Sequence, residues 1–248
     1  MTLILLVVIG AAVAGLIQGL AGFGFGLVAM AFWAWAVSPH LAGPMVVFGS
    51  LVGQILGIGS VKRGFDAARA LPFIIGGVLG VPAGVILLQY IDATWFKFAV
   101  GALLVIYCPV MLFAADLPRV TAGGRFADGL AGVAGGVMGG LGGLTGPAPT
   151  LWCSLRGWGK DEQRAVFQSF NLTMAALTLA TYALTGLLTR ETTHMFLLVL
   201  PAMFIPTLIG TRLYTRFSDV AFRRLILVLL SLSGTVLLVA TVPTLLHR

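Results

Sequence analysis

The chain has 248 residues, of which 59% are hydrophobic and only 9% are charged. A soluble domain needs roughly a quarter of charged residues, so this composition excludes a dissolved globule and predicts an integral membrane protein. The net charge of +7 does not indicate a nucleic-acid partner. Its Lys and Arg residues lie in short gaps between apolar runs, where membrane topology signals belong, and form no basic patch.

Apolar runs follow one another along the whole chain. In chain order they lie at 3–20, 23–38, 43–60, 71–90 and 97–115, and then at 128–141, 143–155, 165–188, 194–213 and 223–245. A helix needs about 20 apolar residues to span a bilayer, and about 17 suffice in a tight design. The first run lacks the basic start of a signal peptide and continues past any cleavage point, so we expect it to be retained as a span.

The two sets of runs resemble each other. GLIQGLAGFGFG, from Gly15, and GVAGGVMGGLGG, from Gly132, open them at an offset of 117–118. The run 47–50 parallels 166–169 at an offset of 119, and Gly84 parallels Gly210 at an offset of 126. Three matches in the same order predict a duplication. We therefore expect a first membrane repeat at 1–115, a cytoplasmic junction at 116–127 and a second membrane repeat at 128–248.

The basic residues favour one topology. If each glycine-rich pair of runs enters and leaves on the same side, twelve of the fifteen Lys and Arg residues face one side and three face the other. If each pair crosses once, the split is eight to seven. Cytoplasmic loops carry the basic excess, so the first arrangement is favoured, with both termini outside the cytoplasm and the chain in the cell (inner) membrane.

This topology gives each half an odd number of crossings, so the halves face opposite ways. The predicted fold is all-α and integral to the membrane, with 8–10 hydrophobic segments in two inverted-topology repeats. Each repeat has a Gly-rich broken-helix hairpin plus three transmembrane helices. Whether the hairpins cross fully or re-enter stays open. Inverted repeats are typical of secondary transporters.

The glycine-rich breaks are the candidate site. A break at membrane depth leaves backbone groups that lipid cannot satisfy, so it lines a cavity or is buried in protein, and half-helix N-termini attract anions. The predicted substrate-binding residues are the hairpin glycines with nearby amides and a hydroxyl: Gln18, Gly22, Gly24, Gly26, Gln54, Gly142, Gly143, Thr145, Gln168 and Asn171. A purely structural role, in close helix packing and in hydrogen bonds between helices, is the alternative.

Other chemistry has no sequence support. The chain has no nucleotide-binding P-loop and no His-Glu-x-x-His, and its acidic residues lie between the apolar runs or at their ends. We therefore expect no catalytic residues, no metal and no cofactor, and no obvious proton-relay carboxylate. Cys108 and Cys153 lie in apolar runs, which indicates buried free thiols.

A family resemblance follows from these motifs. The openings GLIQGLAGFGFG and GVAGGVMGGLGGLTGPAP, with RGWGKDEQRAVFQSFNL after the second, resemble the sulfite exporter TauE/SafE family over essentially the whole chain. The first copy reads Phe-Gly-Phe-Gly where that family often has a run of glycines. The resemblance implies export or uptake of small sulfur-containing or organic anions.

The function we expect is secondary transport, as an exporter, of a small anion such as sulfite, a sulfonate or a related organic acid. The two repeats would alternate access to the site. The expected partners are the small anionic solute and the lipid bilayer, and a homo-oligomer stays open. A passive anion channel and a non-transporting membrane scaffold are the alternatives.

Overall fold

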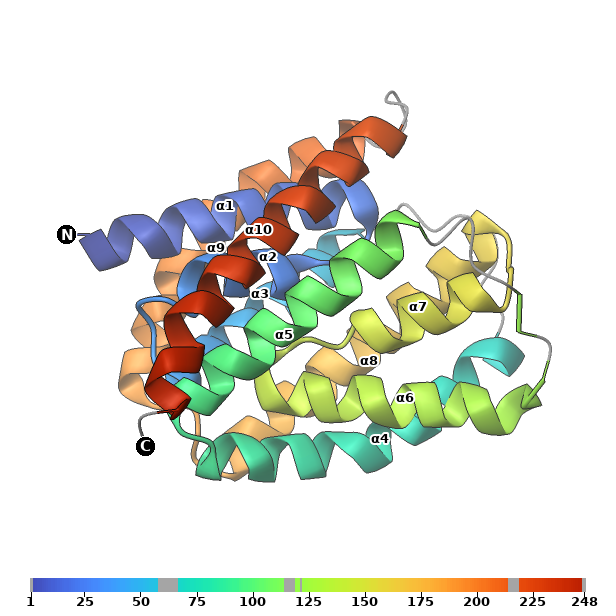
Figure 1. The fold of residues 1–248 in the computed structure, drawn as a ribbon, viewed down its shortest axis with the longest axis horizontal. Coiled ribbons are helices and arrows are strands. Elements are labelled where there is room, and N and C mark those ends of the chain that lie inside the picture. The colour runs from blue at the N-terminus through green and yellow to red at the C-terminus, as the bar shows by residue number, and fades with distance from the viewer. Residues whose placement is uncertain (1, 58–66, 114–118, 121, 214–218, 247–248) are drawn as a thin grey trace.

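The computed structural model describes residues 2–57, 67–113, 119–120, 122–213 and 219–246, and within these ranges it contains only helices and connecting segments (Figure 1). The helices are α1 (Thr2–Ala21), α2 (Phe25–Trp33), α3 (Pro39–Gly57), α4 (Ala67–Tyr90), α5 (Ala93–Leu112), α6 (Gly124–Gly142), α7 (Pro147–Leu155), α8 (Lys160–Leu184), α9 (Arg190–Leu213) and α10 (Asp219–Leu246).

Each predicted run corresponds to one helix, but two of the helices are much shorter than predicted. The runs 23–38 and 143–155 form α2 and α7, which have nine residues each. Gly24, with a φ of +99°, delays the start of α2, and Pro147 sets the start of α7. Nine residues rise about 13.5 Å, roughly half of the hydrocarbon core. Each hairpin therefore pairs a long helix with a half-length one.

Most of the remaining eight described helices have the length and surface of membrane spans. Six are long and apolar enough to cross a bilayer: Thr2–Ala21, Pro39–Gly57, Ala68–Tyr90, Ala93–Leu112, Arg190–Leu213 and Ile226–Leu246. Large apolar side chains on them face outward, such as Leu79 at 70% exposure and Ile106 at 66%. Lipid is the solvent that suits such a surface. The chain is an all-α, multi-pass membrane protein.

Helices far apart in the sequence pack against each other in a regular pattern. Helix α1 lies along α9, and α4 lies along α6 (Figure 1). Thus the first helix of each set of five contacts the fourth helix of the other set. The third helices, α3 and α8, contact each other, as do the fifth helices, α5 and α10. The two sets are therefore interleaved rather than side by side.

Glycines allow the closest of these contacts. A Cβ on Gly19 of α1 would overlap the Thr207 carbonyl oxygen and lie 2.8 Å from the Thr211 nitrogen of α9. A Cβ on Gly140 of α6 would overlap the Val81 carbonyl oxygen and lie 2.8 Å from the Val85 nitrogen of α4. Such backbone-to-backbone approach is possible only where both helices present small residues.

These contacts give a different register from the sequence comparison. Gly19 and Gly140 meet equivalent atoms of α9 and α4, and their offset is 140 − 19 = 121. The predicted offset of 117–118 matched Gly19 with Gly136, one helical turn earlier. Gly84 and Gly210, matched at 126, do contact equivalent atoms: Gly84 meets the Val137 carbonyl oxygen and Gly210 meets that of Leu16.

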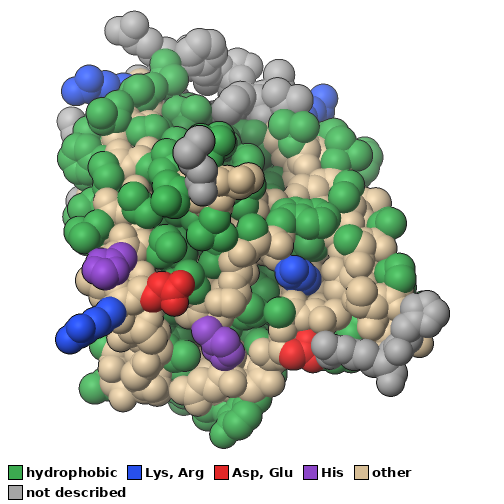
Figure 2. Space-filling model, turned by 90° about the vertical axis from the view of Figure 1, so that its left-hand side faces the viewer, with side chains coloured by type: hydrophobic (Ala, Val, Ile, Leu, Met, Phe, Trp, Pro, Cys, Tyr) green, Lys and Arg blue, Asp and Glu red, His purple; other side chains and the backbone are tan. Residues whose placement is uncertain are grey.

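Charge is concentrated at one end of the bundle. Both chain termini lie at one end, and the N-terminal ends of α4, α6 and α10 lie at the other (Figure 1). Figure 2 looks onto the end with the termini and shows isolated charged and His side chains among hydrophobic ones. The helix ends at the opposite end carry a set of arginines: Arg69, Arg125, Arg156, Arg164 and Arg212.

Candidate functional site

The first hairpin breaks at residues 22–24. Gly22 has a φ of +78° and Gly24 a φ of +99°, the left-handed region that favours glycine, so the chain turns back at once into α2. Two amides hold this turn. Gln18 Nε2 donates to the Ser50 carbonyl at 2.9 Å, and Gln54 Nε2 donates to the Gly22 carbonyl at 3.1 Å. Through Gln54, helix α3 satisfies a backbone acceptor of the break that lipid would leave unpaired, and Gln18 anchors α1 to α3 beside it.

The second hairpin breaks at residues 143–146. Gly143, with a φ of +69°, caps α6 and donates its N–H to the Gly139 carbonyl. Thr145 Oγ1 lies 2.7 Å from Asn171 Oδ1 of α8, and the Tyr182 hydroxyl donates to the Gly140 carbonyl at 2.6 Å. Helix α8 thus supports the second break as α3 supports the first.

A tryptophan ties the short helix of each hairpin to its long helix. Trp33, at the end of α2, donates its indole N–H to the Val7 carbonyl of α1 at 3.3 Å. Trp152 of α7 donates to Asp128 Oδ1 of α6 at 2.7 Å. The acceptor of the first hydrogen bond is a neutral backbone carbonyl, whereas the acceptor of the second is a carboxylate.

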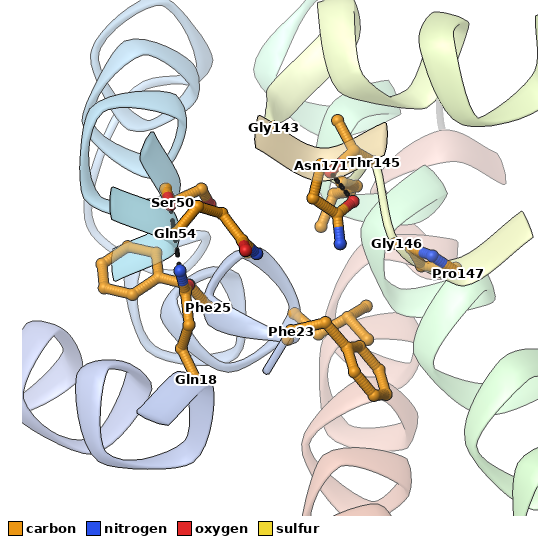
Figure 3. Close-up of a pocket in the computed structure, with 14 residues that line it drawn as sticks. Gln18, Phe23, Phe25, Ser50, Gln54, Gly143, Thr145, Gly146, Pro147 and Asn171 are labelled. Atoms are coloured by element: carbon orange, nitrogen blue, oxygen red, sulfur yellow. Dashed lines mark hydrogen bonds between the residues drawn. The ribbon is translucent and has the colours of Figure 1, made fainter. Parts of the chain in front are cut away.

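The two breaks meet around one small cavity (Figure 3). Its volume of about 20 Å³ has room for an object the size of a water molecule. Its walls come from both hairpins and from the two third helices: Gln18 and residues 23–27, Ser50 and Gln54 of α3, residues 143–147, and Asn171 of α8. All of its lining side chains are uncharged.

The cavity brings together seven of the ten predicted site residues. They are Gln18, Gly24, Gly26, Gln54, Gly143, Thr145 and Asn171. Gly22 lies just behind the wall, where its carbonyl accepts the bond from Gln54. Gly142 and Gln168 are not part of the lining. Gly142 packs against Met30 and Phe96 instead, which would be 3.2 and 3.3 Å from a Cβ at that position.

The prediction missed several lining residues. Ser50 contributes its backbone carbonyl, and Phe23 and Phe25 contribute rings. Phe23 also packs edge-on against Phe167 of α8, with 5.7 Å between ring centroids, so it links the first hairpin to α8. Among so many apolar residues, no sequence signal separates a phenylalanine in this wall from one facing lipid.

The cavity offers hydrogen-bond donors rather than charge. The backbone N–H groups of Phe25, Gly26 and Leu27 are the first three of α2, so none has an acceptor within that helix. The Asn171 side-chain nitrogen points into the cavity, away from Thr145 (Figure 3). Helix α7 contributes less, because Pro147 and Pro149 lack N–H groups. Helix N-termini with free donors favour anions.

A buried carboxylate lies at the arginine-rich end of the second hairpin. Asp128 is only 3% exposed, although its place at the end of an apolar run gave no sign of burial. It accepts the Trp152 indole N–H and pairs with Arg156 Nε at 3.4 Å. Removing one partner of a buried pair is costly, so these contacts fix the far end of α7 against α6.

An ion pair on the adjoining surface joins α4 to α8. Arg69 pairs with Glu162 in the exposed first turn of α8 and also lies 5.4 Å from the centroid of the Trp158 ring. The hydrogen bond from Arg69, with a second from the Gly159 N–H, holds the pKa of the Glu162 carboxyl below its usual range. Within the described residues, no three His, Cys, Asp or Glu side chains gather as a metal site.

An all-helical membrane bundle, with two broken hairpins meeting at a small polar cavity, has the architecture of a membrane transporter. A family model described as sulfite exporter TauE/SafE matches residues 7–237. The chain belongs to that family of membrane transporters. Comparisons with curated proteins and with solved structures gave no significant match.

Proposed function

We propose that this protein is a secondary transporter that exports a small anion, such as sulfite, a sulfonate or a related organic acid. The observation that carries the proposal is the cavity between the two hairpins. It combines the free N–H groups of α2 with the Asn171 amide and has no acidic side chain in its wall. Such a site stabilises negative charge without binding it irreversibly.

The proposed substrate-binding residues are those of the hairpin breaks and their supporting helices. Gly24, Gly26 and Gly143 allow the anion to approach the backbone, while Gln18, Gln54, Thr145 and Asn171 orient it. The cavity lining does not include Gly22, Gly142 and Gln168, so in this proposal they affect binding without direct contact with the cavity. The cavity has room for an object about the size of a water molecule, which suits a carrier better than an open conducting channel.

Alternating access would come from two inverted-topology repeats, 1–115 and 128–248, joined by a cytoplasmic junction at 116–127. The interleaved contacts of α1 with α9 and of α4 with α6 support a twofold relation between the repeats. The arginine-rich end supports a cytoplasmic position for the junction, with both termini outside, in the cell inner membrane.

Uptake into proteoliposomes tests the proposal. The purified protein should take up radiolabelled sulfite or a small sulfonate with a rate that saturates. Asn171→Ala should lower that rate at least about tenfold at low substrate, because a hydrogen bond to a charged group contributes about 1.5–3 kcal/mol. Thr173→Ala, two residues from Asn171 and about 200° around α8, is the control, since its hydroxyl bonds to the Ser169 carbonyl of its own helix.

Three outcomes would reject the proposal or part of it. A rate that rises linearly with substrate would indicate a channel. An absence of flux for every anion tested, with a partner protein co-purifying, would favour a membrane scaffold. If Asn171→Ala and Thr173→Ala lowered the uptake rate equally, the cavity would not be the binding site.

A further inference from the structure

Helix α8 carries a stripe of polar residues along its whole length. Arg164, Gln168, Asn171, Thr178 and Tyr182 follow at intervals of four, three, seven and four residues. At about 100° per residue, these positions fall within an arc of about 80°, so they share one face of the helix. The stripe begins at the arginine-rich end, passes the cavity at Asn171 and continues toward the opposite end.

The stripe is buried rather than solvated. Gln168 is 5% exposed, Asn171 is 4%, and Thr178 and Tyr182 are both 0%. Asn171 and Tyr182 are hydrogen-bonded to the second hairpin. Gln168 Oε1 and Thr178 Oγ1, by contrast, are buried without a hydrogen-bond partner among the described residues. A buried polar atom left without a hydrogen-bond partner is destabilising, and proteins usually satisfy such atoms with water.

The two unsatisfied atoms belong to residues on either side of the cavity-lining Asn171 along α8. With a rise of 1.5 Å per residue, Gln168 lies about 4.5 Å from Asn171 along the helix axis, and Thr178 about 10.5 Å in the other direction. Water at both positions would extend the cavity into a hydrated path along α8. The cavity would then be the middle of a longer route.

Arg164 gives this route a charged entrance. Its Nε and Nη1 atoms are buried, and a Cβ on Gly22 would lie 3.5 Å from its Nε, so the guanidinium lies beside the first hairpin break. The corresponding neighbours of Gly143, at the second break, are the apolar Val46 and Val47. Among the nearest described neighbours of Gly22 and Gly143, a cation therefore lies only beside Gly22, and a guanidinium binds oxyanions in a bidentate manner.

We propose that the polar face of α8 is one wall of the anion's route through the protein. Arg164 draws the anion from the arginine-rich end, Gln168 and Asn171 pass it to the cavity, and Thr178 and Tyr182 line the remaining path. The substrate class in this inference rests on the proposed function. The existence and location of the route rest on the stripe itself.

Thiol labelling tests the route without requiring transport. In a Cys108→Ala, Cys153→Ala background, Gln168→Cys and Thr178→Cys should react with a small anionic methanethiosulfonate reagent at least about tenfold faster than control variants. The controls are Thr173→Cys and Thr181→Cys, on the same helix, whose native hydroxyls bond to their own helix backbone. Equal or negligible labelling at all four positions would overturn the route.

A second arm tests Arg164 by charge. Added to Gln168→Cys, Arg164→Gln should slow the anionic reagent about tenfold while leaving a cationic reagent of equal size unaffected or faster. Arg164→Lys should restore at least half of the anionic rate, and Arg125→Gln, on an exposed arginine at the same end, should change neither. If Arg164→Gln slowed labelling by both reagents equally, Arg164 would have only a structural role. That result would overturn its assigned role in attracting the anion.

The two proposals fail in different ways. If Gln168→Cys and Thr178→Cys label while the parent protein moves no anion, the proposed function is rejected and the route is supported. A parent protein that transports sulfite, while Gln168→Cys and Thr178→Cys stay unlabelled, rejects the route and supports the function.

Discussion

Glycines of the two hairpins are required for different physical reasons. At Gly24 a Cβ would have open space, with its nearest contact at 3.8 Å, but the φ of +99° disfavours any side chain. At Gly142 the helical backbone accepts a side chain, but Met30 and Phe96 leave little room for it. Sequence reasoning gave both glycines the same role. The difference depends on backbone angle and neighbours, which the residue type alone does not encode.

Gly24→Ala, compared with Gly186→Ala, separates backbone strain from site function. Gly186 also has a positive φ, of +75°, and open space around a Cβ, but lies in the turn between α8 and α9. Both variants should lose about 1–2 kcal/mol of stability, seen as similarly lowered melting temperatures in detergent. Only Gly24→Ala should also lose most sulfite uptake in proteoliposomes. Equal uptake by the two variants would show that the Gly24 break does not touch the anion.

The choice of amides could be made from sequence, but the geometry around them could not. Gln18, Gln54, Gln168 and Asn171 were predicted because a full amide is costly to bury without a partner, and all of them except Gln168 line the cavity. Their partners are mainly backbone carbonyls, such as that of Ser50, which any residue supplies. Sequence therefore indicates which side chains must be satisfied but not what satisfies them.

At the scale of helices, close glycine contacts decide which elements pack together. Glycines every four residues on α4 and α6 bring the two backbones together, as do Gly15, Gly19 and Gly210 between α1 and α9. The run lengths predicted ten segments, and ten helices are described. Which helices pair with each other was not predicted, because a helix face of glycines can pack against any other face of small residues. The register was also wrong by one turn, since glycines four residues apart make neighbouring registers look alike.

Gly80→Val should disrupt the α4–α6 pair. A Cβ there would overlap the Val133 carbonyl oxygen and lie 2.9 Å from the Val137 nitrogen, both backbone atoms that cannot rotate away. Overpacking costs about 1–3 kcal/mol or more, so the variant should elute as aggregate or melt many degrees lower in detergent. Leu79→Val, at an adjacent position with 70% exposure, should behave like the parent. Parent-like melting of Gly80→Val would contradict the close packing.

The buried Asp128 provides a second prediction at this scale. Asp128→Asn keeps an acceptor for the Trp152 indole and loses only the ion pair with Arg156, whereas Asp128→Ala loses both contacts. Asp128→Ala should therefore be destabilised by about 3–5 kcal/mol and Asp128→Asn by less. Thermal unfolding followed by Trp fluorescence measures both. Identical melting temperatures for the two variants would show that the indole hydrogen bond contributes nothing.

For the molecule as a whole, charge at the helix ends is the feature that sets orientation. Sequence alone placed most of the basic residues on one side, because it counted runs and gaps. The arginine-bearing ends of α4, α6, α8 and α9 do lie at the end opposite the chain termini (Figure 1). The positive-inside rule predicts that this basic end faces the cytoplasm.

Single cysteines at the two ends test the orientation. In the cysteine-free background, an impermeant thiol reagent applied to intact cells should label Thr193→Cys and should not label Ala122→Cys. Both positions are exposed, the first at the start of α9 and the second just before α6. Permeabilised cells, in which both variants should label, provide the control. The reverse pattern in intact cells would invert the proposed topology, and labelling of both would contradict their placement at opposite ends.

The interleaving of α1 with α9 and of α4 with α6 bears on how such a chain arose. If the chain were cut between α5 and α6, each fragment would keep two helices whose glycine faces had lost their partners. Neither fragment would have a complete site, because each contributes only one of the two breaks. If the chain arose by the duplication that its sequence repeats predict, a half-length ancestor would have needed a second copy of itself to cover these helix faces and to complete the site.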